Sequence, residues 1–300
     1  MAVKESNVIV GTQSAQTGPA EEEKSIRDVL LVVGARLLDV IGFVRDTAKQ
    51  LARGKFREVY LRFWWLCAIR RRRRLGEKLI AAHGTRVQTG PFKGMQYVKS
   101  AIGSELCPKL LGSYEAELHE AVNKILRKQY ERIINIGCAE GYYAIGLAMR
   151  QPRAFVVAFD FNPMARQLCE EMAALNHVSD RLLLGSECSH DDLRRAIGSK
   201  TLIFCDCESY EYELLRPDVV PQLAQVDMLV ELHDFIDDRI SPAIISRFSA
   251  THDITLIDST DRNGSDYASL QNFSARDRRL AVNEYRAYSQ QWALMLHRNH

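Results

Sequence analysis

Apolar and polar residues follow two different patterns along this chain, and the pattern changes near residue 86. Between Ser25 and Val44, apolar residues recur every three or four positions with charged residues between them, which predicts an amphipathic helix. From about residue 86, short apolar runs alternate with helical patterns. The first 24 residues show neither pattern. We expect a disordered tail over 1–24, a basic helical extension over 25–85 and one domain over 86–300.

Strand and helix signals alternate within that domain. The expected strands cover residues 132–136, 154–159, 181–184, 201–205, 226–232, 253–258 and 291–296. The expected helical segments cover residues 114–129, 142–150, 163–175, 190–197, 209–224 and 261–289, and residues 89–98 are expected to form a turn that leads into a strand. Such alternation predicts a Rossmann-like, doubly wound and mostly parallel α/β sheet of seven strands. The last two strands have no crossover helix between them, so a late strand should be antiparallel.

The overall composition fits a globular protein of 300 residues with 26% charged residues and a net charge of +2. Its seven cysteines show neither C-x-x-C nor zinc spacing, which suits reduced thiols. No signal-peptide pattern is readable, and Arg36 and Asp39 interrupt the apolar stretch of the first helix, so a membrane span is not expected. We therefore expect a cytoplasmic protein, with a peripheral membrane location as an alternative.

The positive charge is concentrated in one segment. Residues 45–75 contain eleven Lys or Arg against Asp46 and Glu58, a net charge of +9 that leaves −7 for the rest of the chain. This asymmetry indicates an anionic partner. Within the segment, three aromatic residues precede the arginine run 70–74, and 61–74 is therefore a candidate for docking on an anionic membrane surface. There are two alternatives for 61–74: the aromatic side chains pack on the domain while the arginines are solvated, or the arginines bind nucleic acid. The N-terminal helices could also form a homodimer through residues 25–52.

The sequence RIINIGCAEGYYAIG contains a glycine turn between the first strand of the domain and a helix. Gly137 and Gly141 bracket this turn. A dinucleotide-binding turn would also need glycines at positions 139 and 142, where the chain has Ala139 and Tyr142. The pattern therefore argues against a nicotinamide dinucleotide.

Polar residues at the ends of the next two strands, together with this turn, indicate an adenosine-type ligand. Asp160 follows the second strand, nineteen residues beyond Gly141, where an acid can accept hydrogen bonds from both ribose hydroxyls. Glu187 and Cys188 end the third strand, where polar groups can face an adenine edge.

This combination resembles class I S-adenosylmethionine-dependent methyltransferases, over roughly residues 86–300. The resemblance implies that S-adenosylmethionine is the cofactor. By the same resemblance, the cofactor-binding residues are Asn135, Gly137, Cys138, Gly141, Asp160, Glu187 and Cys188. Asn135 departs from the acid that the family usually has there, and a neutral amide supplies no charge to the cofactor ammonium group.

A narrower resemblance is to the FkbM-like methyltransferases. Residues 206–215 resemble their D-x-E-G-x-E-x-x-L-L motif, residues 229–234 resemble their E-x-H strand end, and residues 112–118 are similar to their lead-in helix. Ser209 stands where the motif has glycine. This resemblance implies O-methylation of a hydroxyl on a glycan or glycosylated metabolite.

Ionisable residues end the fourth and fifth strands, which should bring them together at one rim of the sheet. Methylating a hydroxyl requires removal of its proton, and His233 is the candidate general base, with Asp206 and Glu208 as further catalytic residues. Glu231 and Asp234 are candidates for substrate binding. The carboxylates could also hold a divalent metal, but no metal is favoured, because such oxygens also serve as simple hydrogen-bond acceptors.

Two other functions are kept as alternatives. One is an RNA methyltransferase that holds phosphates with residues 70–74, although no Asn-Pro-Pro-Tyr-like tetrapeptide follows the fourth strand. The other is a non-catalytic adaptor with a methyltransferase fold. Late in the chain, we expect Trp292 to be a core residue and residues 283–286 to form a surface ion pair.

Overall fold

The computed structural model describes residues 56–286 and 288–298, with side chains from residue 67 onward. The chain divides into two compact units at the Ile69–Arg70 peptide, and the fold described below belongs to residues 70–300. The tail predicted over 1–24 and the dimer contact predicted over 25–52 lie outside the described residues. Among the helices that the structure describes, none combines the length and the apolar character that crossing a bilayer needs.

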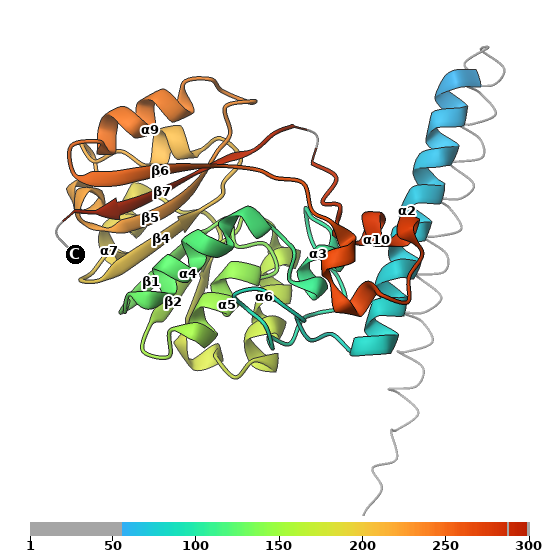
Figure 1. Ribbon diagram of the computed structural model, residues 1–300. Helices are drawn as coiled ribbons and strands as arrows, with labels where there is room; N and C mark the ends of the chain where they lie inside the picture. Colours follow the sequence, from blue (N-terminus) through green and yellow to red (C-terminus); the bar gives the residue numbers. More distant parts are fainter. Residues whose placement is uncertain (1–55, 287, 299–300) are drawn as a thin grey trace, which may run out of the picture. The chain divides into compact units, whose positions relative to one another are not determined.

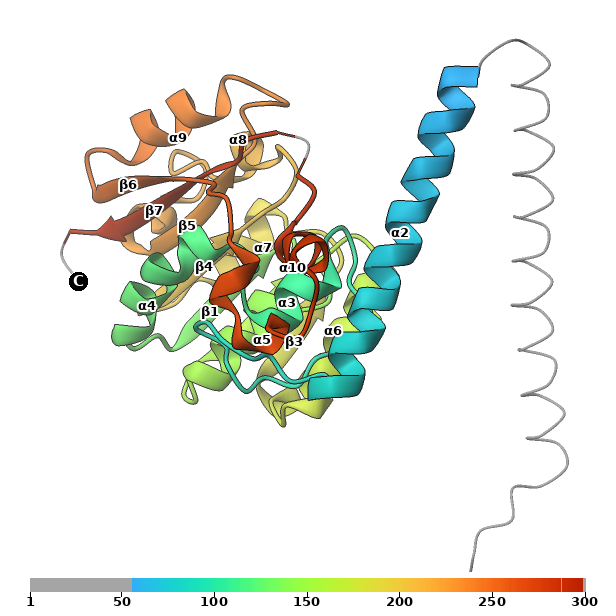
Figure 2. The same cartoon turned by 45° about the vertical axis from the view of Figure 1, so that its right-hand side comes forward.

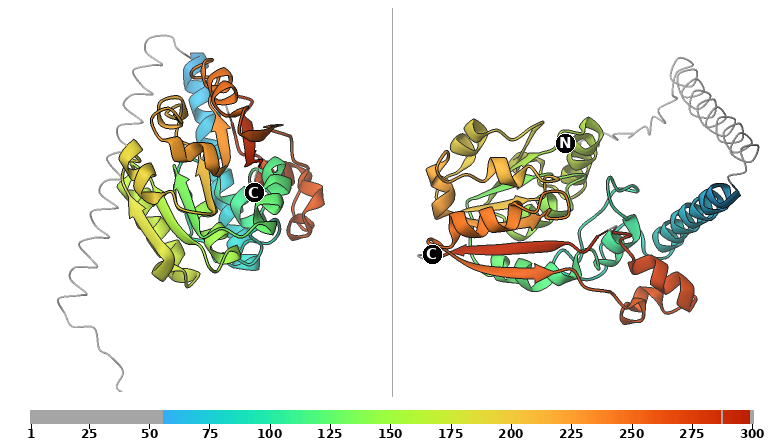
Figure 3. Two further views of the ribbon diagram at one scale, coloured as in Figure 1. Left: turned by 90° about the vertical axis from the view of Figure 1, so that its left-hand side faces the viewer. Right: turned by 90° about the horizontal axis from the view of Figure 1, so that it is seen from above.

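A seven-stranded sheet in the order β3-β2-β1-β4-β5-β7-β6 forms the centre of the fold (Figure 1). Strands β1 to β5 are parallel, and β7 is antiparallel to both β5 and β6. The strands are β1 Arg132–Ile136, β2 Phe155–Phe159, β3 Leu182–Gly185, β4 Thr201–Cys205, β5 Asp227–Leu232, β6 His252–Asp258 and β7 Gln291–His297. Seen from above, β6 and β7 run side by side (Figure 3). The predicted fold class, including the late antiparallel strand, is confirmed.

Helices cover both faces of the sheet, as Figure 2 shows. The helices are α2 Phe56–His83, α3 Leu106–Leu111, α4 His119–Arg127, α5 Tyr142–Arg150, α6 Pro163–Leu175, α7 His190–Ala196, α8 Glu211–Leu214, α9 Ile240–Phe248 and α10 Ala275–Val282. Alternate residues of β1 belong to opposite cores: Ile133 packs with α4, α5 and α6, whereas Ile134 packs with α7, α8 and α9. The central strands are therefore apolar on both faces, as parallel sheets require. Trp292 is fully buried in the first of these cores, which confirms its prediction.

Several expected helices are shorter in the structure. The helix expected over 114–129 begins only at His119, after a short 3-10 turn. Of 209–224, only α8 and the 3-10 turn Pro221–Gln225 are helical, because proline lacks the N–H that an α-helix interior needs. Of 261–289, α10 is the longest helical part.

One other expectation about secondary structure is wrong, and one helix was not predicted. Residues 89–98 form no strand and contribute only the isolated bridge between Arg86 and Gln96. Helix α9, Ile240–Phe248, was not predicted although it packs on the sheet. It contains Pro242 in its first turn, a position where proline is tolerated but where it obscures the helical pattern.

The second half of α2 belongs to the same compact unit as the sheet. Leu75 and Leu79 are buried in a third hydrophobic cluster, which also contains Cys107, Leu111, Leu270, Ala281 and Val282. Arg71 donates to Asp277 at 2.9 Å, and Arg72 lies 3.3 Å from Glu105. Arg71 and Arg72 are therefore ion-paired with residues of this unit beyond α2, and Arg73 pairs with Glu77 on α2 itself.

Candidate active site

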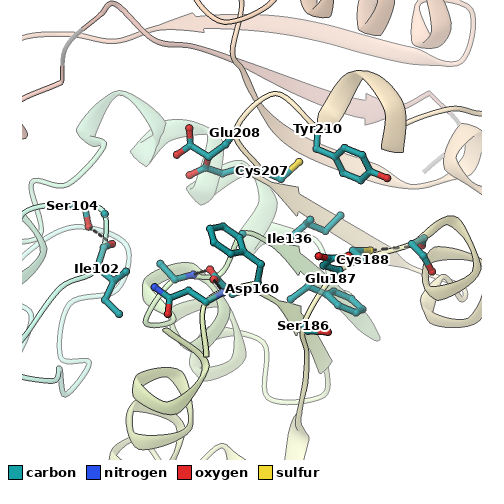
Figure 4. Close-up of a pocket in the computed structure, with 18 of the residues that line it drawn as sticks. Ile102, Ser104, Ile136, Asp160, Ser186, Glu187, Cys188, Cys207, Glu208 and Tyr210 are labelled. Atoms are coloured by element: carbon teal, nitrogen blue, oxygen red, sulfur yellow. Dashed lines mark hydrogen bonds between the residues drawn. The ribbon is translucent and has the colours of Figure 1, made fainter. Parts of the chain in front are cut away.

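A pocket of about 620 Å³ lies at the carboxyl ends of the parallel strands β1 to β4, the position where α/β sheets bind ligands. Figure 4 shows Asp160 near its middle, with Ile102 and Ser104 on one side and Glu187 and Cys188 on the other. The volume lies within the range of small-molecule sites. Of the predicted site residues, the ones that line the pocket are Gly137, Asp160, Glu187, Cys188, Asp206 and Glu208.

Both glycines of the turn have a backbone reason to be glycine. Gly137 has a φ of +76° and Gly141 a φ of +97°, backbone conformations that residues with a Cβ rarely adopt. A Cβ on Gly137 would lie 1.6 Å from the carbonyl oxygen of Asp206, and one on Gly141 would lie 2.8 Å from Sγ of Cys169. The turn is thus pressed against the end of β4.

Asp160 fixes the turn from the end of β2. Its Oδ2 accepts a hydrogen bond from the backbone N–H of Ala139 at 2.8 Å, and its Oδ1 accepts one from Asn162 at 2.8 Å. Each carboxylate oxygen has a second lone pair, so Asp160 can still accept from a ligand. Phe161, next to it, is strongly exposed and borders the pocket.

Three predicted cofactor residues, Asn135, Cys138 and Gly141, do not line the pocket. Asn135 is buried within β1, where its Nδ2 donates to the carbonyl of Phe204 at 3.4 Å and its Oδ1 has no partner. The structure therefore does not bring Asn135 to the ligand side of the strand end.

The turn itself contains a buried charged residue whose role was not predicted from the sequence. Glu140 is fully buried, and its Oε1 lies 2.5 Å from Nζ of Lys109 and accepts a hydrogen bond from the Tyr97 hydroxyl. Its Oε2 accepts from the backbone of Ile102 at 3.1 Å. Burial alone would raise the pKa of Glu140, but Lys109 and the hydrogen bonds hold it below its ordinary value. These contacts tie the pocket wall at 102–104 and Lys109 to the turn.

His233 lies among four carboxyl groups. Its Nε2 is 3.6 Å from Oδ1 of Asp206, 3.8 Å from Oε2 of Glu208 and 3.8 Å from Oε2 of Glu231, and its Nδ1 is 2.9 Å from Oε1 of Glu211. The expectation that the ends of the fourth and fifth strands meet is confirmed. His233 itself is 2% exposed and stands behind Asp206 and Glu208, which line the pocket.

The ionisation of this group follows from its burial. Burial, Asp206 and Glu115 raise the pKa of Glu231, and burial raises the pKa of Asp206. Interaction with Asp206 raises the pKa of Glu231, whereas interaction with Glu231 lowers that of Asp206, so Glu231 is the carboxyl of this pair that is more easily protonated. Burial alone would lower the pKa of His233, but the neighbouring Glu211 outweighs it and raises this pKa above its usual value.

Glu211 is a site residue to which the sequence analysis gave no role, although it is the third acid of the quoted D-x-E-G-x-E motif. Ser209, which replaces the glycine of that motif, has a φ of +85°, and Glu208 has a φ of +56°. The motif glycine thus corresponds to a left-handed backbone position. This turn directs Glu208 toward His233 and brings Glu211 behind the ring.

Asp234 does not join the group. Its Oδ1 accepts from the backbone of Ser241 at 2.9 Å, and its Oδ2 accepts from the Ser241 hydroxyl. Asp234 therefore holds the loop that leads into α9.

The ion pair expected on the surface at 283–286 is buried instead. Glu284 is 4% exposed and Arg286 14% exposed, and their side chains lie 2.7 Å apart. Arg286 also contacts Glu115 at 3.0 Å. Arg262 joins the same network through Glu117 and through Glu284 at 2.9 Å. The prediction was wrong because sequence separation of about 170 residues hid the partners.

No protein-family model matches this chain. Among curated proteins, it is similar to a release factor glutamine methyltransferase of Deinococcus radiodurans, with 35% identity over 69 residues. That segment is 23% of this chain, and it spans only a quarter of the length of the curated relative.

Three solved structures have a similar overall arrangement. They are an O-methyltransferase described as putative from Klebsiella pneumoniae (13% identity, 62% of this chain and 80% of that one, TM-score 0.40), the O-methyltransferase TomG of Streptomyces achromogenes (14%, 61% and 79%, 0.40) and a precorrin-6y C5,15-methyltransferase of Geobacter metallireducens (10%, 67% and 92%, 0.43). The fold class rests on the strand order of this chain itself. That order and the pocket define an α/β protein with a Rossmann-like sheet and a pocket at its strand ends, where α/β sheets bind ligands.

Proposed function

We propose that this protein is an S-adenosylmethionine-dependent methyltransferase that methylates a hydroxyl of a glycan or glycosylated metabolite. One observation carries the proposal: a single pocket extends from Asp160, Glu187 and Cys188 to Asp206 and Glu208 in front of His233. A nucleoside-type methyl donor would thus share one cavity with the carboxylates of Asp206 and Glu208, which have His233 behind them.

The donor would occupy the side of the pocket formed by β1, β2 and β3. Asp160 would accept hydrogen bonds from the ribose hydroxyls, and Glu187 with Cys188 would face the adenine. The methionine part would pass Gly137, where the absence of a Cβ brings the backbone close to the end of β4. Lys109 lines the same cavity and would offer a positive charge to the methionine carboxylate.

The acceptor hydroxyl would lie beside Asp206 and Glu208. As its oxygen attacks the methyl carbon, S-adenosylhomocysteine leaves and the hydroxyl proton must be taken up. His233 remains the candidate base, and its raised pKa makes it a stronger proton acceptor than an ordinary imidazole. Because His233 is not part of the pocket wall, the proton would reach it through one of the two carboxylates.

The acceptor class is supported by the motif resemblance over residues 206–215. The curated relative acts, by its name, on a glutamine of release factors. Its short match supports methyl transfer as the reaction but gives no support to a particular acceptor.

Calorimetry with S-adenosylhomocysteine tests the cofactor site. Replacing Asp160 with Ala should weaken binding at least about tenfold, since a charge-assisted hydrogen bond contributes about 1.5–3 kcal/mol. Asp180→Ala, at an exposed acid in the loop before β3, is the matched control and should bind as the unaltered protein does. Absence of binding by the folded protein, or equal binding by Asp160→Ala, would remove the proposal.

The acceptor class has its own test. Incubating the protein with methyl-labelled cofactor and an extract should place the label in a carbohydrate-containing fraction, as an ether stable to mild alkali. Label that follows RNA, and disappears on ribonuclease treatment, would instead establish the RNA methyltransferase alternative. No labelled product with any fraction would favour the adaptor.

A further inference from the structure

The atoms around Nε2 of His233 have the spacing of ligands about a shared ion. Nε2 lies 3.6 to 3.8 Å from one oxygen each of Asp206, Glu208 and Glu231, which is too long for a hydrogen bond. Two atoms that each bind an ion at ~2.1 Å lie about 3.0–3.6 Å apart at angles of 90° to 120°. The ligand atoms of Asp206, Glu208 and His233 all lie within 4.8 Å of one another, so a small inward movement would place these three atoms on one cation.

The charge of this group also calls for a cation. Four carboxyl groups, those of Asp206, Glu208, Glu211 and Glu231, surround one imidazole. Within the described residues, no Lys or Arg side chain forms an ion pair with any of the four. Glu211 and Glu231 are buried, whereas the Glu208 side chain is 76% exposed. Burying a carboxylate without a cation beside it is costly, so a cation next to Glu231 would stabilise the group.

Buried atoms without a hydrogen-bond partner lie in this group. Glu231 is 2% exposed and its Oε1 has no partner, and Oε2 of Glu211 has none either. His233 is equally buried, with Glu211 2.9 Å from Nδ1 and with Asp206, Glu208 and Glu231 on the side of Nε2. A carboxylate beside the ring nitrogen that does not bind the metal is the arrangement found at metal-binding histidines.

We propose that Asp206, Glu208 and His233, which together with the adjacent Glu231 are here called the His233 cluster, bind one divalent cation. The mixture of carboxylate oxygens and one imidazole suits Mn²⁺ or a similar first-row ion. Asp206 and Glu208 also line the pocket, so the open coordination positions face the place assigned to the acceptor hydroxyl. Binding of the acceptor oxygen by the ion rests on the proposed function, whereas binding of the ion does not. With an ion present, His233 is a ligand rather than the base.

A neighbouring group is the competing site. Cys205, Cys207 and Glu211 also bring ligand atoms together, with the two sulfurs 3.5 Å apart. Thiol sulfur is a soft ligand, whereas a hard ion such as Mn²⁺ prefers oxygen, so Mn²⁺ discriminates between the two groups.

The test is a titration of the full chain, freed of metal with a chelator, with Mn²⁺ followed by electron paramagnetic resonance. One equivalent should bind, and Asp206→Asn or Glu208→Gln should weaken binding at least tenfold. The matched control is Glu213→Gln, an exposed acid on α8 that removes one charge without removing a ligand. Cys207→Ser should also bind Mn²⁺ as the unaltered chain does.

Three results would overturn the metal site: no Mn²⁺ bound at millimolar concentration, equal binding by Asp206→Asn and Glu208→Gln, or loss of binding in Cys207→Ser alone. Calorimetry with S-adenosylhomocysteine on the same samples verifies the fold and separates the two proposals. Binding of Mn²⁺ without binding of S-adenosylhomocysteine would refute the methyltransferase proposal and leave the metal site. Binding of S-adenosylhomocysteine without binding of Mn²⁺ would refute the metal site and leave the methyltransferase proposal.

Discussion

At the residue scale, the backbone around the pocket leaves little freedom to its turn residues. Gly137 combines a left-handed φ with close contact to the carbonyl of Asp206, so one glycine sets the distance between the cofactor turn and the His233 cluster. Gly94 has a φ of +94° but no atom within 4 Å of a Cβ position. A substitution at Gly94 therefore tests only the free-energy cost of the left-handed backbone, whereas one at Gly137 also tests the cost of the steric contact.

Gly94→Ala should destabilise the protein by about 1 kcal/mol, the cost of a left-handed conformation. Gly137→Ala should cost about 1–3 kcal/mol more, since the end of β4 has to shift as in other overpacked sites. It should also weaken binding of S-adenosylhomocysteine. Urea unfolding and calorimetry measure the two effects, and equal stabilities of the two variants would show that the contact with Asp206 is unimportant.

At the element scale, a buried charge network joins two segments that are far apart in the sequence. Arg262 and Arg286 come from the irregular stretch between β6 and β7, and Glu115 and Glu117 come from the turn before α4. The stretch from 259 to 290 also packs apolar side chains of α10 into the third hydrophobic cluster. The ion pairs add a second attachment, to the turn before α4.

Arg262→Met should destabilise the protein by about 3–5 kcal/mol, because it leaves Arg286 to pair alone with the carboxylates of Glu115, Glu117 and Glu284. Arg298→Met breaks an exposed pair with Asp253 and should cost less than about 1 kcal/mol. Urea unfolding of both variants checks the comparison. A cost for Arg262→Met as small as that for Arg298→Met would mean that the network is not a structural connection.

At the scale of the whole molecule, the folded domain begins inside a helix. Residues 70–83 of α2 contribute Leu75 and Leu79 to a hydrophobic cluster with α3 and α10, whereas the sequence analysis began the domain at residue 86. The lead segment before Arg70 forms a separate unit. The segment 61–74, the candidate for docking on an anionic membrane surface, therefore includes the end of one unit and the beginning of the next.

A chain that begins at Arg70 should fold and bind S-adenosylhomocysteine like the full chain. A chain that begins at residue 86 should be less stable by about 4 kcal/mol or more, because it loses two buried leucines that cost about 2–5 kcal/mol each. Thermal unfolding and calorimetry on the two chains provide the measurement. Equal stability of both chains would place the start of the domain after α2.

The sequence by itself determined the sheet and the position of the site within it. Strand and helix periodicities are local, so the seven strands and the meeting of Asp206 with His233 at neighbouring strand ends could be read without any tertiary contact. Only the tertiary structure decided which charged residues are buried. Glu140 with Lys109 and Arg286 with Glu115 are paired across 31 and 171 positions, and no local pattern records a partner at that distance.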